Sequence, residues 1–565
     1  MRALGFVAAV LAFASCTCAH LPDIAFACER DGGCEVEGLR CDPVQQRCVP
    51  AVDAGCTPRT CASALAACGS LDDGCGGTIA SCGPCAAGQG CGAGGRANQC
   101  DVCTGTPADV PDDAYLDSNC DGIDGDAAGA TFVDPVGGDD SAAGTLTAPV
   151  RTLGAAVRLR RPQVLLAAGL YAGEVNLGAT VSLYGGYSLP GWGRGLTKAI
   201  IDGGLTAKAR TSPLTLDRLA VTARAAASPG APAVALTLVD DVAGSTVKHC
   251  AFTALRGADG EAGLGGSAGA GGEDGGVGSC DGTVSAPGGA GGTALCGDVA
   301  GTGGTGGRGG DPSASDKALQ SGAAGAPAAL GGGGGEVVTC SSEPCQSGAD
   351  GGDGRPGPEG AAGGEGDAGA PLGSIAGGVW IASRGAEGAA GSVGPGGGGG
   401  GGGAALMSAG STVATSGCGG GGGGGGGCGG VGGRGGQGGG ASIAMLLVNA
   451  SPALLDVKLV TEGGGAGGVG GRGGGGGRGG SGGLGGAPRS AISTTSGFGG
   501  RGGSGGNGGA GGTGGPGAGG PSIGLWCEGT STPTGRDSLT FTLGPGGAGA
   551  AGALPGVQLA TSGCR

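Results

Sequence analysis

The chain has 565 residues, of which 155 are glycine and only 2% are aromatic. Large side chains are therefore too scarce to fill a conventional globular core. The formal net charge of −15 argues against nucleic-acid binding, which depends on a basic patch or stripe. Solubility and the binding of divalent cations fit this acidic composition better.

Residues 1–15 predict an export signal, because one basic residue is followed by an apolar run and a small residue precedes Cys16. The run is too short to be a permanent membrane anchor. The sequence FASC at 13–16 resembles a bacterial lipobox, in which the signal is cut before the cysteine. This resemblance implies that Cys16 carries lipid, that residues 16–27 are an anchor and linker, and that the protein sits in the outer membrane. The alternative is ordinary secretion, with Cys16 and Cys18 in a disulfide.

Cysteines are dense from residue 28 to residue 103, and the region divides into two units, 28–55 and 56–103. Neither unit has enough apolar residues to fold on burial alone, so cross-links must supply the stability. We therefore predict two small disulfide-rich modules, whose connectivity cannot be read from spacing. The cysteines concerned are Cys28, Cys34, Cys41, Cys48, Cys56, Cys61, Cys68, Cys75, Cys82, Cys85, Cys91, Cys100 and Cys103.

Two Cys-x-x-Cys pairs in the second unit, Cys82/Cys85 and Cys100/Cys103, leave a four-thiolate zinc site as an alternative. In an exported chain with 25 cysteines, disulfides are the expected use. Both units resemble Cys-rich repeats at the N-terminus of surface proteins from myxobacterial-type species. The resemblance implies a stalk between a lipid anchor and the rest of the chain.

An acidic segment, residues 104–130, follows these units and contains DDAYLDSNCDGIDGD. Oxygen ligands at alternate positions, followed by a glycine, match the first half of a calcium-binding EF-hand loop. An EF-hand loop has a carboxylate at its twelfth position, which is Ala128 here, so the segment is not an EF-hand. A compact thrombospondin-type acidic loop is a second way in which it would bind calcium. The alternative is a solvated acidic linker. The candidate calcium ligands are Asp117, Asn119, Asp121, Asp124 and Asp126.

Residues 132–203 form the only long stretch with an ordinary soluble-domain pattern. Short apolar runs recur there, each punctuated by glycine, asparagine or aspartate, which predicts strands and turns. Residues 152–161 have helical spacing, and Pro162 ends the helix. A helix over the first of many stacked strands would blunt an open sheet edge. The predicted strands are 164–167, 175–177, 181–184 and 199–201.

Farther along, one strand is expected at 214–221, and then a pair of short strands repeats between glycine tracts. Strand pairs that cannot bury themselves alone indicate a solenoid of stacked rungs. The tracts, at about 257–375, 385–440 and 462–520, would then be insertions at one edge of the rungs. The predicted pairs are 233–238 with 246–252, 442–448 with 454–460, 522–527 with 538–543, and a degenerate 378–382 with 404–407.

The order of these features resembles the secreted right-handed parallel β-helix, or pectin-lyase-like, proteins. The likeness rests on the GGDD start, the predicted cap helix and the LYGGY strand at 183–187. It implies an all-β fold: a right-handed parallel β-helix, a solenoid, across residues 131–565, with long Gly-rich insertions and preceded by the disulfide-rich modules.

The glycine tracts repeat every three residues, as in GGRGGSGGNGGAGGTGG. Three is the period of the polyproline-II helix, and glycine at two positions in three lets such helices pack closely. Collagen is excluded, because only 29 prolines are present in the whole chain. By composition the tracts resemble mycobacterial PE-PGRS proteins and the polyglycine-II bundles of some antifreeze proteins. The alternative is a disordered linker. Three pairs of cysteines lie inside the tracts, and we expect a local disulfide in each pair: Cys280 with Cys296, Cys340 with Cys345, and Cys418 with Cys428.

Evidence for catalysis is sparse. The chain has two histidines and no phosphate-binding Gly-Lys-Ser/Thr motif. Enzymes of the β-helix fold generally use clustered carboxylates with a basic residue, but turn chemistry or solvation accounts for the acids here. The few aromatic residues that could stack on sugars, Tyr171, Tyr184, Tyr187 and Trp192, are expected to pack the cap. The candidate catalytic residues are Asp202, Asp217, Arg218, Asp240 and Asp241.

These features together predict an exported, non-enzymatic surface protein with a structural or adhesive role. Its expected partners are extracellular polysaccharide or cell-envelope components, and the outer membrane through a lipid on Cys16. Calcium is the one expected cofactor. The alternative is a polysaccharide-active lyase or hydrolase, which would require three of the acidic residues to converge on one groove with an arginine or lysine.

Overall fold

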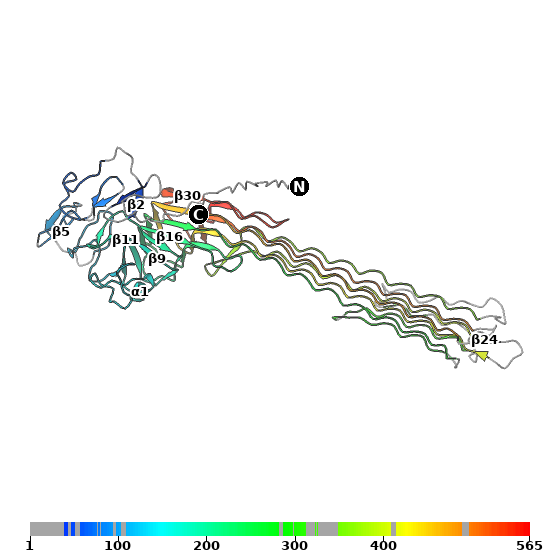
Figure 1. The fold of residues 1–565 in the computed structure, drawn as a ribbon. Helices are drawn as coiled ribbons and strands as arrows, with labels where there is room; N and C mark the ends of the chain where they lie inside the picture. Colours follow the sequence, from blue (N-terminus) through cyan, green and yellow to red (C-terminus); the bar gives the residue numbers. More distant parts are fainter. Residues whose placement is uncertain are drawn as a thin grey trace, which may run out of the picture.

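A computed structural model gives the fold (Figure 1). The predicted signal and anchor, and with them Cys16, Cys28, Cys34, Cys56 and Cys103, lie outside the described residues. The structure describes residues 39–42, 47–50, 57–69, 71–75, 77–79, 81–86, 88–93, 96, 98–102, 109–281, 286–297, 299–311, 322–323, 325, 348–407, 414–488 and 496–565.

Three parallel β-sheets form the head of the molecule. The first sheet contains β7 (Thr131–Val133), β8 (Gln163–Ala167), β11 (Ser182–Ser188), β15 (Thr215–Asp217), β18 (Thr246–Lys248) and β27 (Ala453–Leu455). The second contains β9 (Leu170–Ala172), β13 (Ala199–Asp202), β16 (Leu219–Ala223), β19 (Ala251–Ala254), β28 (Val457–Thr461) and β30 (Leu539–Leu543). The third contains β10 (Val175–Leu177), β14 (Leu205–Lys208), β17 (Ala233–Val239), β26 (Ser442–Val448), β29 (Ser522–Glu528) and β31 (Gln558–Ser562).

The chain passes through the three sheets in turn, so that β8, β9 and β10 are followed by β11, β13 and β14. Residues that are distant in sequence therefore stack in register, as Ile201 does on Val221 and Val221 on Phe252. Their apolar side chains meet in one core between the sheets. The prediction of a nearly all-β chain with parallel sheets is confirmed, and this arrangement is compatible with a β-helix-like fold.

Single residues make the corner between the first and second sheets. Arg218, His249 and Asp456 each have a left-handed backbone, with φ of 53°, 52° and 49°. Aspartate and histidine tolerate this conformation better than most residues. The predictions of one continuous strand at 214–221, at 246–252 and at 454–460 are therefore wrong, because these three residues turn the chain from β15 into β16, from β18 into β19 and from β27 into β28.

A short helix covers the start of the sheets, as the sequence predicts. Helix α1 (Leu153–Arg158) is shorter than the predicted 152–161, and the Thr152 hydroxyl accepts the Ala155 N–H at 3.2 Å. This is the N-cap contact that satisfies one of the free N–H groups of a first turn. The helix buries Leu153 and Ala156 against the core.

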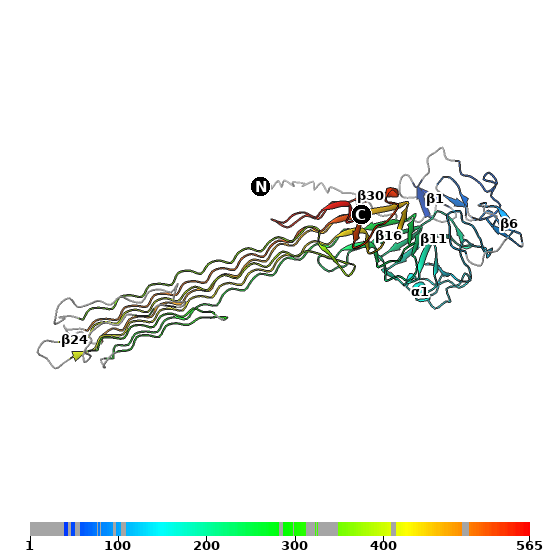
Figure 2. The same cartoon turned by 180° about the vertical axis from the view of Figure 1, so that it is seen from behind.

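The glycine tracts leave the head at one corner, between the second and third sheets. Residues 255–441 connect β19 to β26, residues 462–521 connect β28 to β29, and residues 544–557 connect β30 to β31. Most of the first two connections runs away from the head as a long bundle (Figures 1 and 2). The predicted insertions at 257–375 and 385–440 thus belong to one connection.

Three antiparallel hairpins interrupt the described part of that connection. The degenerate strand pair predicted at 378–382 and 404–407 is wrong, because these residues enter hairpins and not the parallel sheets. Trp380 lies 3% exposed over Ile443, Leu446 and Trp526, so the second hairpin covers the outer face of the third sheet. The hairpins are β20 (Leu295–Cys296) with β21 (Val299–Ala300), β22 (Ser374–Ala376) with β23 (Val379–Ile381), and β24 (Leu406–Met407) with β25 (Ala414–Thr415).

The Cys-rich region is built from short antiparallel pairs. In the first pair, Cys41 lies opposite Cys48 in register. Two further elements complete the described set: β12 (Gly193–Arg194), which pairs with β11, and the 3-10 helix η1 (Arg536–Ser538). The short pairs are β1 (Leu39–Asp42) with β2 (Arg47–Pro50), β3 (Leu71–Asp72) with β4 (Thr78–Ile79), and β5 (Gln89–Cys91) with β6 (Cys100–Val102).

Candidate functional site: a glycine-rich bundle and a charged corner

The glycine tracts are joined by backbone hydrogen bonds with a period of three residues. The N–H groups of Gly257, Gly260 and Gly263 donate to carbonyls at residues 463, 466 and 469, at 3.0, 2.7 and 2.8 Å. The same step continues to Gly278. Three residues per turn is the period of the polyproline-II helix. The disordered-linker alternative is therefore wrong for the described parts of the tracts.

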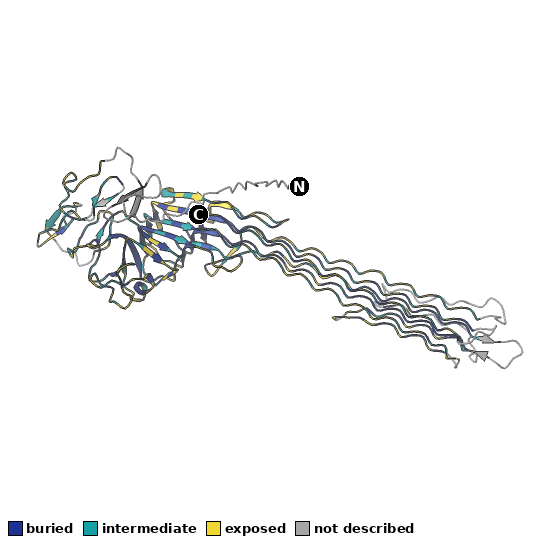
Figure 3. Cartoon of the chain, viewed as in Figure 1, coloured by how far each residue is buried: buried dark blue, intermediate teal, exposed yellow. Residues whose placement is uncertain are grey.

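The tract at 417–440 lies at the centre of the bundle. The N–H groups of Gly421, Gly422 and Gly423 donate to three different tracts, at 2.9, 2.9 and 2.8 Å. The carbonyls of residues 420–422 accept from three more tracts, each at 2.8 Å. Residues 419–427 are all buried, and Figure 3 shows the buried interior running along the bundle. The six surrounding tracts are 258–279, 286–293, 301–310, 396–403, 466–486 and 498–516.

Close packing of backbones explains the run of nine glycines at 419–427. A Cβ atom at Gly421 would lie 2.1 Å from the carbonyl oxygen of Gly483, and one at Gly422 would lie 1.9 Å from that of Ala290. Beyond the disulfide-bonded Cys428, side chains return at Val431 and Arg434, which are exposed. Triplets of GGG therefore mark parts of a tract that neighbouring tracts enclose on all sides. Triplets of GGX mark parts with one face open to solvent.

Two disulfides cross between tracts. The predicted local pairs Cys280/Cys296 and Cys418/Cys428 are wrong, because the bonds are Cys280–Cys418 and Cys296–Cys428. The two cysteines of each bond are separated by 138 and 132 residues. The folded tracts run side by side, so cysteines at the same height along the bundle meet. The predicted pair Cys340/Cys345 lies outside the described residues.

Acidic side chains line the two lateral edges of the bundle. The Asp259 carboxylate accepts the N–H of Ala466 and that of Asp274 accepts the N–H of Ser481, both at 2.7 Å. On the other edge, Asp353 accepts the N–H of Arg501 at 2.7 Å. These carboxylates accept hydrogen bonds from backbone N–H groups that no neighbouring tract binds. They also leave both edges charged, which opposes pairing at the edge with another chain.

In the head, a buried ion network lies behind the first sheet. Arg194 is fully buried and contacts the Asp124 carboxylate at 3.0 Å and the Asp217 carboxylate. Arg218 donates to Asp217 at 2.9 Å. The expectation that Asp217 is solvated is wrong, since its side chain is 0% exposed. Burial acts to raise the pKa of Asp124, against the opposing charge of Arg194, to about 7.

The network reaches the surface at a charged corner, which we define as Asp113, Arg218, Lys248, His249 and Asp456. Asp113 contacts Lys248 at 3.0 Å, Arg218 at 3.2 Å and His249 at 3.3 Å. His249 also contacts Asp456 at 3.2 Å. The corner joins the acidic segment to three successive strand turns. Partial burial acts to raise the pKa of Asp113, but hydrogen bonds from Lys248 and Arg218 lower it to about 2.

The charged corner should make the docking of the acidic segment sensitive to acid. A carboxylate whose pKa is lowered in the folded state stabilises that state above its unfolded pKa, near 3.8. This stabilisation is lost as the pH falls from about 4 to about 2. We expect the melting-temperature difference between the unmodified chain and Asp113→Asn to be largest near pH 6 and to shrink toward zero as the pH falls through about 2. A difference independent of pH would contradict the ion-pair account.

Asp113, Asp217 and His249 place their ligand atoms within 4.8 Å of one another. A metal ion fits this group poorly, because Lys248 and Arg218 contact the same carboxylates and already balance their charge. No motif or spacing in the sequence marks Arg194, Asp113 or Lys248 as functional. The DD pair at 112–113 is the one available signal, and it opens the segment for which the sequence predicts a calcium-binding loop or an acidic linker.

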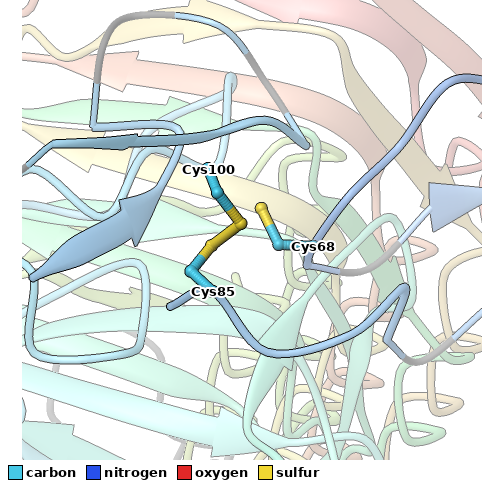
Figure 4. A group of neighbouring side chains, drawn as sticks. All are labelled: Cys68, Cys85 and Cys100. Atoms are coloured by element: carbon cyan, nitrogen blue, oxygen red, sulfur yellow. A yellow bond between two sulfur atoms is a disulfide. The ribbon is translucent and has the colours of Figure 1, made fainter. Parts of the chain in front are cut away.

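A second close group, Cys68, Cys85 and Cys100, consists of disulfide sulfurs (Figure 4). Cys85 is bonded to Cys100 and Cys68 to Cys91. A third bond joins Cys61 to Cys82. The thiolates of the zinc alternative are therefore engaged in disulfides at all three of its described positions, Cys82, Cys85 and Cys100. The prediction of disulfides is confirmed for these residues.

The candidate calcium ligands are not gathered into one cluster. Asp117 accepts the N–H groups of Asp121 and Gly122, each at 3.0 Å, and Asp126 accepts the N–H of Gly129 at 2.8 Å. Asn119 donates to Asp121 at 2.8 Å, and Asp124 is held by Arg194. These are the turn contacts that Asx residues make in loops. Calcium binding by this segment stays a prediction.

The candidate catalytic residues also lie apart. Asp202 pairs with Arg224 at 3.2 Å on the surface, and Asp240 accepts a hydrogen bond from Asn449 at 2.9 Å. The Asp241 carboxylate has no hydrogen-bond partner in the described chain. Asp217 and Arg218 belong to the buried network. The convergence that the enzyme alternative requires is therefore not seen among Asp202, Asp217, Asp240 and Asp241.

The aromatic residues pack rather than line a sugar site. Tyr187 and Trp192 are 0% and 4% exposed, and Phe132 contacts Trp192 edge-on with ring centroids 4.8 Å apart. They fill a cluster on the outer side of the first sheet, beneath Ile123. Tyr171 lies in the main core, where its hydroxyl donates to carbonyls of Val133 and Ala167.

Comparison of the chain with protein-family models, with curated proteins and with solved structures finds no match. Within the described ranges, no helix is long and apolar enough to cross a membrane.

Proposed function

We propose that this chain is an exported, non-enzymatic protein of the cell surface with a structural or adhesive role. The observation that carries the proposal is the central tract of nine glycines, buried among six others. A hydrogen-bonded bundle of this kind is stiff. The described tract from residue 257 to residue 278 alone extends about 65 Å at the polyproline-II rise.

In this proposal the head is a right-handed parallel β-helix, and the glycine tracts are insertions at one of its corners. The successive passage of the chain through three parallel sheets supports this reading. The disulfide-rich units form a stalk, Cys16 carries the lipid, and the outer membrane holds the protein at the cell surface. Replacing Cys16 by serine should abolish lipid incorporation, as read by mass spectrometry of the mature N-terminus.

The partner we propose is an extracellular polysaccharide or another cell-envelope component, with calcium bound by the acidic segment. The test uses the exported chain with a panel of acidic and neutral polysaccharides, with calcium and with chelator. Both co-sedimentation and chain cleavage are measured. Binding without cleavage supports adhesion, and neither supports a passive structural role. Cleavage that is lost in Asp240→Asn would overturn the proposal in favour of a lyase or hydrolase.

A further inference from the structure

Four tracts lie side by side and form one flat face of the bundle. In order they are residues 350–368, 498–516, 466–484 and 259–277. Gly354 donates to the carbonyl of Arg501 at 2.7 Å, Gly502 to that of Gly483 at 2.9 Å, and Gly263 to that of Val469 at 2.8 Å. One residue in three of each tract points out of this face, and we call this surface the four-tract face.

The outward residues of the four tracts form rows across the face. Gly363 donates to Ala510, Gly511 to Gly474 and Gly269 to Gly475, all at 2.8 or 2.9 Å. These bonds align one row that has almost no side chains: Ala362, Ala510, Gly475 and Ala268. A Cβ atom at Gly475 would meet nothing within 4 Å. The middle of the face is therefore flat and open to a partner surface.

The rows on either side of this flat row carry opposite charges on different tracts. One row has Glu359 on the first tract and Arg478 on the third, and the other has Glu365 on the first and Arg472 on the third. All four residues are exposed, and neither arginine forms an ion pair with another described residue. Within one chain, each glutamate lies two tract spacings, or about 10 Å, from the arginine in the same row.

We propose that the four-tract face pairs with the same face of a second copy of this chain. A two-fold axis parallel to the bundle, above the tract 498–516, brings the first tract of each copy over the third tract of the other. Glu359 then faces Arg478, and Glu365 faces Arg472, twice each across a self-complementary interface. The flat rows meet between them.

The charge pattern selects the orientation of the pair. If the bundles ran antiparallel, Glu359 would face Glu365 and Arg478 would face Arg472, which is repulsive. The parallel pair places both heads at the same end. On the axis, Phe498 meets Phe498 and Arg501 meets Arg501, and the Asp353 carboxylate, which accepts the backbone N–H of Arg501 at 2.7 Å, supplies a negative charge on the neighbouring tract.

The face is large enough for a stable dimer. With the axis above tract 498–516, three tracts of each copy overlap; they are about 56 Å long and together span about 14 Å, so each copy buries about 800 Å². Stable pairs typically bury about 800 Å² on each partner. This association goes beyond the proposed adhesive role and does not depend on any polysaccharide.

Sedimentation velocity of the full chain over a concentration series tests the proposal. We expect a monomer–dimer equilibrium that weakens with salt. Reversing one charge, in Glu359→Arg or in Arg478→Glu, should raise the dissociation constant about tenfold or more. The double variant Glu359→Arg/Arg478→Glu restores opposite charges and should return close to the original value.

Asp367→Arg is the matched control, because Asp367 lies on the same tract and is exposed but points away from the four-tract face. This variant should dimerise like the unmodified chain. The proposal is overturned if the chain is monomeric at every accessible concentration. It is also overturned if Asp367→Arg weakens the dimer as much as Glu359→Arg, or if the double variant fails to restore it.

Discussion

Gly476→Ala is expected to destabilise the bundle by about 3 kcal/mol. A Cβ atom there would lie 1.8 Å from the carbonyl oxygen of Gly508, inside a lattice whose backbones cannot separate without breaking hydrogen bonds. The neighbouring tract would have to move away along its length. Hydrogen exchange of the amides in residues 499–516, followed by mass spectrometry, measures the loss of stability as faster exchange.

The control for this variant is the preceding residue. Gly475 is also glycine, but a Cβ atom there meets nothing within 4 Å, and its backbone is not left-handed. Gly475→Ala should leave the bundle unchanged or stabilise it by about 0.5 kcal/mol, because alanine restricts the unfolded chain. Equal damage from both substitutions would contradict the packed-backbone account, since composition alone does not distinguish these two glycines.

Arg194→Met should destabilise the head by about 3–5 kcal/mol, because it leaves the buried carboxylates of Asp124 and Asp217 without their shared counter-charge. We expect the cost to appear in urea unfolding monitored by far-ultraviolet circular dichroism. The acidic segment should also loosen, since Arg194 donates to the Asp112 carbonyl at 2.9 Å.

Arg224→Met provides the comparison, because Arg224 pairs with Asp202 at 3.2 Å on the surface. Exposed pairs contribute less than about 1 kcal/mol, so this variant should unfold nearly as the unmodified chain does. If the two arginine variants behaved alike, the buried network would not stabilise the head in the way described.

Much of the head could be predicted from its sequence. The apolar runs at 164–167, 175–177 and 199–201 all fall within parallel strands, and the cap helix lies where its spacing and Pro162 predict it. The corner between the first and second sheets could not be predicted. Its left-handed residues are Arg218, His249 and Asp456 rather than glycine, so no breaker marks the point where one strand becomes two.

In the bundle, the three-residue period was visible in the sequence, and it predicted order. Which tract lies beside which was not visible, because every GGX tract offers the same backbone to its neighbours. The wrong pairing of Cys280 with Cys296 follows from this, since contacts across 138 residues leave no local signal. The change from GGX to GGG does carry information, because it marks where a tract becomes fully enclosed.

The buried network was missed for a different reason. Asp217 lies in a strand with alternating apolar and polar residues, a pattern that predicts a solvated charge. Its partner Arg194 comes from β12, a two-residue strand that folds back onto β11 and has no apolar pattern of its own. Burial of Asp217 depends on this partner, which only the folded chain supplies.

Amide hydrogen exchange at single-residue resolution tests most directly the claim that the glycine tracts form an ordered bundle. Every N–H from Gly419 to Gly427 donates to a neighbouring tract, so we predict slow exchange at all nine. In residues 499–515, two N–H groups in three donate to a neighbouring tract, and the exposed Ser504, Ala510 and Thr513 should exchange fast in the monomer. Fast exchange throughout both tracts, without a three-residue period, would contradict the bundle.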